Sequence, residues 1–150
     1  MKELKKILCA VDFSDMSKIV ASYANTFGEK FGSEVIVLYV APSLTQYVGF
    51  HVPPASIETF VGEIVSGAEK KMDVFVQENF EGIQVRGVVK TGYPAEEILD
   101  LADSECVDMI VMGTHGRTGI DKILFGSVAE KVVKTANMPV LTVRPEQKKD

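Results

Sequence analysis

Short apolar runs alternate along the chain with segments whose apolar residues recur at helical spacing, and this alternation constrains the fold more than any other feature. Strict alternation of strand and helix implies parallel strands joined by right-handed crossovers. We therefore predict a doubly wound, Rossmann-like α/β fold with a five-stranded parallel sheet, helices on both faces and the strand order 3-2-1-4-5. The predicted strands cover residues 4–11, 35–40, 83–89, 107–112 and 140–143, and the predicted helices cover 19–31, 57–75, 94–102 and a segment from Ser127.

Length and composition limit the class of protein. With 150 residues and 46% hydrophobic content, the chain is predicted to form a single domain over residues 1–150. It has no signal-like segment and no apolar stretch that could span a bilayer, which predicts a cytoplasmic protein without a membrane partner. A net charge of -5 and the absence of Trp argue against nucleic acid as a partner. Cys9 and Cys106 lack a CxxC context and are expected to be buried or semi-buried thiols.

The strongest functional signal is a glycine pattern after the fourth predicted strand, with nine residues between its two halves. Its members are Gly113, His115 and Gly116 in the first half, and Gly126, Ser127 and Val128 in the second. Glycines let backbone N–H groups approach an anion without a Cβ in the way, and some adopt a positive φ. The start of a helix near Ser127 would add N–H groups and a positive dipole end. Together the halves predict a phosphate site.

Simpler interpretations of each half remain open. Ser127 and Glu130 form a capping box, so Ser127 could serve only as a helix cap. The glycines of the first half could form a plain tight turn. Between the halves, Arg117 and Lys122 give a local positive excess that suits a polyphosphate, although single exposed bases are usually just solvated. We rank Arg117 above Lys122 because it directly follows Gly116.

Asp12 directly follows the first predicted strand, beside the expected ligand edge. In doubly wound sheets ligands lie where the winding reverses, here between the first strand and strand 107–112. Asp12 is thus either a ligand contact or a cap of the helix that follows. The phosphate-loop pattern GxxxxGK[ST] and the dinucleotide pattern GxGxxG are both absent, and no acid ends the second strand. Both of these common nucleotide folds are therefore disfavoured.

The chain resembles the universal stress protein family over essentially its whole length. The resemblance is carried by residues 7–14, by Thr91-Gly92-Tyr93-Pro94, by residues 108–113 and by the motif Gly-x2-Gly-x9-Gly-Ser, which is similar to the ATP-binding branch. It implies that the motif residues hold the phosphates, largely through backbone N–H groups. It also implies that Asp12 and the backbone of Val40 contact the adenosine half and that Met112 lines the pocket. Ala10, which stands where many members have proline, and Arg117 complete the candidate site.

The expected function is nucleotide-dependent regulation or stress response, through binding of ATP with Mg2+ held by the phosphates, or of AMP. No catalytic group is evident, so hydrolysis is expected to be slow at most. The alternatives are a slow ATPase or phosphotransferase, and a dimeric interaction protein that does not use ATP. The strand at Val140–Val143 is expected at a sheet edge, where a second copy could pair to form the homodimer that the resemblance implies. A loop at residues 41–54, which carries His51, is the expected lid. The sequence identifies no protein partner.

Overall fold

The computed structural model describes residues 2–41, 54–115 and 126–145, which form a five-stranded parallel sheet in the order β3-β2-β1-β4-β5. The elements are β1 (Lys6–Ala10), α1 (Asp15–Phe31), β2 (Glu34–Ala41), α2 (Pro54–Asn79), β3 (Val85–Thr91), α3 (Pro94–Ser104), β4 (Met109–Gly113), α4 (Ser127–Thr135) and β5 (Val140–Val143). The predicted fold class and strand order are confirmed. Within these residues no helix has both the length and the apolar character needed to cross a membrane.

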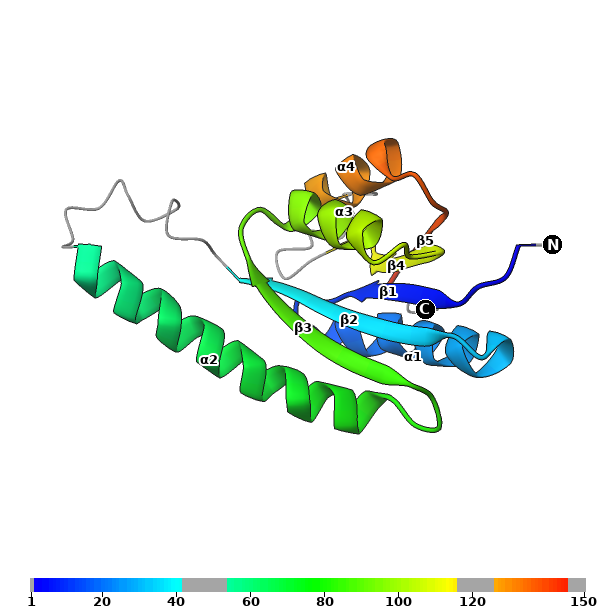
Figure 1. Ribbon diagram of the computed structural model, residues 1–150, viewed down its shortest axis with the longest axis horizontal. Coiled ribbons are helices and arrows are strands. Elements are labelled where there is room, and N and C mark those ends of the chain that lie inside the picture. The colour runs from blue at the N-terminus through cyan, green and yellow to red at the C-terminus, as the bar shows by residue number, and fades with distance from the viewer. Residues whose placement is uncertain (1, 42–53, 116–125, 146–150) are drawn as a thin grey trace, which may run out of the picture.

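The helices form two layers, one on each face of the sheet. The helices α1 and α2 cover one face, and α3 and α4 cover the other (Figure 1). Successive side chains of β1 therefore enter different cores: Ile7 and Cys9 pack with α1 and α2, whereas Leu8 packs with α3 and α4. Because both faces are covered, the central strands β1, β2 and β4 are apolar over most of their length, whereas the edge strand β3 carries Arg86 and Lys90.

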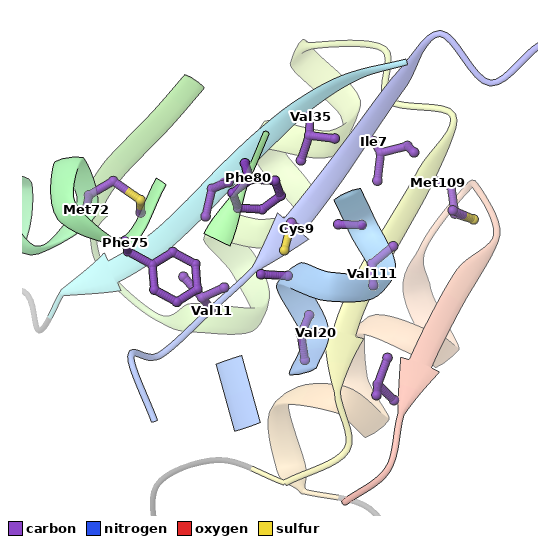
Figure 2. Packing of buried hydrophobic residues seen from close by; sticks show 14 residues of the cluster. Ile7, Cys9, Val11, Val20, Val35, Met72, Phe75, Phe80, Met109 and Val111 are labelled. Carbon is purple, nitrogen blue, oxygen red and sulfur yellow. The ribbon is translucent and has the colours of Figure 1, made fainter. Parts of the chain in front are cut away.

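The larger core lies between β1 and the helices α1 and α2. Figure 2 shows Met72 and Phe75 of α2 and Val20 of α1 in the same buried cluster as Cys9 of β1. The long helix α2 approaches closely because β3 has a glycine there: a Cβ on Gly87 would lie 2.3 Å from Cγ of Met72. Burying a side chain the size of Val, Ile or Met stabilises the fold by about 1.5–3 kcal/mol. This core fixes the sheet whose carboxyl edge carries the candidate site.

Some element boundaries agree with the sequence prediction and others differ. The helix α2, predicted over 57–75, extends over Pro54–Asn79, and β1 and β4 begin two residues later than predicted. The helix α1 begins at Asp15 rather than 19, because its first turn is largely polar and shows little apolar periodicity. It ends where predicted: Gly32 adopts the left-handed conformation with φ 65° and donates its N–H to the Gly28 carbonyl. The strand β3 is shifted by two residues, from 83–89 to Val85–Thr91, since Gly82 forms a turn with φ 72° just before it.

The cysteine prediction is right for one thiol and wrong for the other. Cys9 is fully buried in β1, but Cys106 is exposed. Cys106 lies in the turn between α3 and β4 with a positive φ of 53°, because the strand begins only at Met109. Both cysteines are free thiols. His51, Lys122 and most of the predicted lid at 41–54 lie outside the described residues.

Candidate functional site

A cavity of about 310 Å³ lies at the carboxyl ends of β1 and β4, where the winding of the sheet reverses. Nine candidate residues from the sequence line it: Ala10, Asp12, Val40, Met112, Gly113, His115, Gly126, Ser127 and Val128. Gly116 and Arg117, the other two candidates, lie outside the described residues. The structure therefore brings together, around one cavity, every candidate residue that it describes.

One wall of the cavity is apolar and comes partly from residues that the sequence interpretation missed. Leu38 of β2, Pro94 and Ile98 of α3 and Ala129 of α4 line this wall. They belong to, or adjoin, the core between the sheet and the helices α3 and α4. A flat apolar group such as a nucleobase would fit against such a surface. The signal was present in the sequence, since Pro94 begins the predicted helix that follows the strand at 83–89.

The backbone of Val40 faces the cavity, and the hydrogen bonds of its neighbours establish the direction. The Leu38 carbonyl accepts a bond from Val11 N–H on the β1 side, at 2.9 Å, whereas the Ala41 carbonyl accepts from Gly92 N–H on the β3 side, at 3.0 Å. Backbone groups of successive residues alternate in direction, so those of Val40 point to the β1 side. There β1 has already ended at Ala10, opposite Leu38. Val40 thus offers one donor and one acceptor to the space beyond β1.

Thr114 joins the two halves of the glycine pattern. Its carbonyl accepts a hydrogen bond from Gly126 N–H at 2.8 Å, and its N–H donates to the Val143 carbonyl at 3.0 Å. A Cβ on Gly126 would lie 3.2 Å from the Thr114 oxygen, so glycine allows this close approach. Positive φ, which was an expected reason for the glycines, is used by neither Gly113 nor Gly126. At Gly126 the reason for glycine is therefore space rather than conformation, whereas a Cβ on Gly113 would make only ordinary contacts, at 3.4 Å or more.

The amino end of α4 forms the second half of the site and has no side-chain cap. Gly126 is the N-cap, with extended backbone at φ -70° and ψ 157°, and Ser127 is the first helical residue. The carboxylate of Glu130 accepts a bond from Lys134 Nζ at 2.7 Å. The capping-box alternative is therefore wrong. The N–H groups at the start of α4 precede its first intrahelical bond, from Glu130 N–H to the Gly126 carbonyl, and are oriented to bind an anion.

Asp12 lines the cavity and also holds the turn between β1 and α1. Its Oδ1 accepts hydrogen bonds from the backbone N–H and the hydroxyl of Ser14, and from the Ser17 hydroxyl at 2.9 Å. The N-cap of α1 is Ser14, so the alternative role of Asp12 as the cap itself is not observed. Asp12 instead binds the residues that begin the helix, and this structural role coexists with its place in the cavity.

The residue after Asp12 has an unusual backbone conformation. Phe13 has a φ of 62°, which is sterically costly for a bulky side chain and amounts to about 1–3 kcal/mol. Its ring packs at 4.6 Å from that of Tyr39 and at 5.7 Å from that of Phe75, measured between centroids. Aromatic packing with β2 and α2 therefore maintains the turn that presents Asp12.

Similarity to known proteins extends over nearly the whole chain. The model of the Universal stress protein family matches residues 3–144. Universal stress protein MJ0531 of Methanocaldococcus jannaschii is 36% identical over 96% of this chain and 84% of its own length. The solved structure of MJ0577, from the same organism, has a TM-score of 0.85 and 33% identity, covering 98% of this chain and all of its own. A universal stress protein from Archaeoglobus fulgidus in complex with dAMP has a TM-score of 0.59 and 25% identity, covering 95% of this chain and 98% of its own.

Proposed function

The chain belongs to the universal stress protein family, and we propose that it binds an adenosine nucleotide, preferably ATP, and serves nucleotide-dependent regulation or stress response. The observation that carries the proposal is that the turn after β4 and the backbone donors at the amino end of α4 line one cavity. The turn after β4 and the amino end of α4 are held together by the 2.8 Å hydrogen bond from Gly126 to Thr114. Such donor sets favour a phosphate chain.

In this proposal the two ends of the nucleotide meet different surfaces. The phosphates contact Gly113, His115 and the amino end of α4, with Gly116 and Arg117 as further contacts from the sequence motif. The base lies against the apolar wall, where the N–H and carbonyl of Val40 pair with its edge. The dAMP complex of the Archaeoglobus fulgidus relative supports an adenine nucleotide as ligand. AMP would occupy only part of the same site.

In this proposal Mg2+ is bound mainly by the phosphates of the nucleotide. Among the described residues there is no group of three or more His, Cys, Asp or Glu side chains that could hold a metal ion. Mg2+ usually binds through one or two carboxylates, water and substrate phosphates. Asp12 lines the cavity and could supply one such carboxylate. We therefore expect EDTA to weaken the binding of ATP more than that of AMP.

Calorimetric titration with Mg-ATP tests the proposal, and Ser127→Glu sharpens it. Ser127 is exposed at the first position of α4, where a carboxylate suits the helix dipole and should not destabilise the fold. A charge there would repel the phosphates, so we expect the Kd of ATP to rise at least about tenfold. Ser66→Glu, on the exposed surface of α2, is the matched control and should leave the Kd unchanged. No heat at millimolar Mg-ATP would refute the proposal.

Slow ATP hydrolysis or phosphotransfer is the second candidate. Hydrolysis requires a group that orients the attacking water, and Asp12 is the carboxylate found in the described lining of the cavity. Its Oδ1 already accepts bonds from Ser14 and Ser17, which favours a binding role. Multiple-turnover phosphate release distinguishes the two functions. A rate above background that Asp12→Asn abolishes would establish the enzyme instead.

The homodimer forms part of the proposal and also of the third candidate, an interaction protein that does not use ATP. The strand β5 is at the edge of the sheet, and its Val140, Leu141 and Thr142 are only partly buried in one copy of the chain. Pairing with β5 of a second copy would cover this edge. Light scattering tests the dimer, and a monomer at micromolar concentration would contradict it.

The cytoplasmic location is likewise proposed, and cell fractionation tests it.

A further inference from the structure

The buried side chain of Thr114 lies between His115 and the end of β5. Only 1% of Thr114 is exposed. Its Oγ1 is 2.7 Å from Nδ1 of His115 and 3.4 Å from the carbonyl oxygen of Val143. That carbonyl already accepts the Thr114 N–H at 3.0 Å. The hydroxyl has one proton to donate, and these two neighbours compete for it.

The distances decide which neighbour receives the proton. A hydroxyl normally donates over 2.5–3.0 Å, a range that contains the contact to Nδ1 but not the contact to Val143. If Nδ1 carried the proton instead, it would donate to Oγ1 and leave the hydroxyl proton with only the 3.4 Å carbonyl. A poorly satisfied donor in a buried position costs about 1–3 kcal/mol. The arrangement with Nδ1 as acceptor is therefore favoured.

We propose that Thr114 positions His115 and fixes its neutral imidazole in the tautomer that carries the proton on Nε2. His115 lines the cavity, and Nε2 is the ring nitrogen that remains for a ligand. In this tautomer Nε2 is a hydrogen-bond donor even when the ring is uncharged. It suits a phosphate oxygen, but it has no lone pair with which to accept a proton from water or to bind a metal ion.

This inference rests on the proposed nucleotide site for its functional meaning and deepens it. It assigns His115 to holding phosphate and not to activating water. A general base needs an unprotonated nitrogen within reach of the proton that it removes. The tautomer thus favours binding over hydrolysis at this site.

The tautomer can be measured without nucleotide. The chain has two histidines, His51 and His115, so two-bond 1H–15N correlation spectra of the 15N-labelled apo protein contain two sets of signals, which His51→Asn assigns. At about pH 8.5, above the ordinary histidine pKa, we expect His115 to show a protonated Nε2 and an unprotonated Nδ1. A protonated Nδ1, or a mixture of tautomers in the wild-type protein, overturns the inference.

Two substitutions test whether Thr114 is responsible. Thr114→Val keeps the shape but removes the hydroxyl, so His115 should become a mixture of tautomers and the Kd of ATP should rise about two- to tenfold. Thr114→Ser keeps the hydroxyl and should retain both the single tautomer and the wild-type Kd. A single Nε2–H tautomer in the Val variant would remove Thr114 from this role. If ATP does not bind but the spectra are as expected, only the proposed function fails.

Discussion

The backbone of Gly126 closely approaches that of Thr114 in the candidate site, and Gly126→Ala tests whether the site depends on this contact. The alanine Cβ would lie 3.2 Å from the Thr114 oxygen, about 0.2 Å short of the 3.4 Å at which ordinary contacts begin. The neighbouring atom is a backbone oxygen, so no flexible side chain can yield. The φ and ψ of Gly126, -70° and 157°, suit alanine. The substitution therefore acts through distance and not through backbone strain.

The expected effects on stability and on binding differ in size. Separating Gly126 from Thr114 weakens their 2.8 Å hydrogen bond, a loss of about 0.5–1.5 kcal/mol. Replacing glycine by alanine also restricts the unfolded chain, which returns about 0.4–1 kcal/mol. The net change in the free energy of unfolding should therefore be below about 1 kcal/mol. Binding should suffer more, since the amino end of α4 moves away from the turn after β4. Loss of one backbone bond to a charged phosphate, about 1.5–3 kcal/mol, raises the Kd at least about tenfold.

Calorimetry with Mg-ATP and urea unfolding measure the two quantities on the same variant. Gly67→Ala is the matched control: it lies within α2, and a Cβ there meets no atom within 4 Å. This control should gain about 0.5–1 kcal/mol of stability, as expected for alanine within a helix, and should keep the wild-type Kd. An unchanged Kd in Gly126→Ala, with the fold intact, would show that phosphate is not held between the two halves of the glycine pattern.

Three further predictions concern the rest of the fold. Gly87→Ala should cost about 1–3 kcal/mol in urea unfolding, because the new Cβ presses into α2. The Arg86 guanidinium lowers the pKa of Glu105 below its ordinary value of 4.5, so the folded state binds this proton less readily than the unfolded state. The ion pair therefore contributes its full stability above about pH 4.5, and this contribution is lost as the pH falls through the pKa of Glu105 in the folded protein. Arg86→Met should make the free energy of unfolding depend less on pH, as measured by urea titrations between pH 7 and pH 3. Burial raises the pKa of Cys9 to about 12, whereas Cys106 is exposed, so a thiol reagent should label one cysteine in the native protein and two in urea. Labelling of Cys106→Ser without denaturant would contradict that burial.

The sequence predicted the architecture because burial on both faces of a parallel sheet leaves a visible pattern. The strand at 35–40 is continuously apolar for this reason, and Gly32 marked the end of α1 through its left-handed conformation. Local polarity concealed the start of the same helix at Asp15. Cys106 was misjudged because it adjoins the apolar Val107, although a turn with positive φ separates α3 from β4 at this point. Such a turn depends on how two elements meet and has no periodicity of its own.

The sequence indicated residues that line the cavity where a missing side chain leaves the backbone accessible, and it missed lining residues that only tertiary contacts bring there. Gly113 and Gly126 could be found because missing side chains suggest close approach to the backbone. Thr114 could not, since its side-chain and backbone bonds reach Val143, 29 residues away. That contact exists only once β4 and β5 have paired in register. The side to which the N–H and carbonyl of Val40 point likewise depends on the hydrogen bonds of β2 with β1 and β3, and not on the Val40 side chain.

The balance between backbone and side-chain donors bears on what the site can do. Backbone N–H groups at the start of α4 and the exposed edge of Val40 do not titrate, and they move only with their elements. In the proposed function they would provide affinity for phosphate and base but no acid–base chemistry. Any chemistry therefore depends on a few lining side chains, above all Asp12 and His115. One oxygen of Asp12 holds the turn before α1, and Nδ1 of His115 is engaged by Thr114. Hydrogen bonds thus occupy one polar atom of each group, which favours the proposed binding of a nucleotide over its hydrolysis.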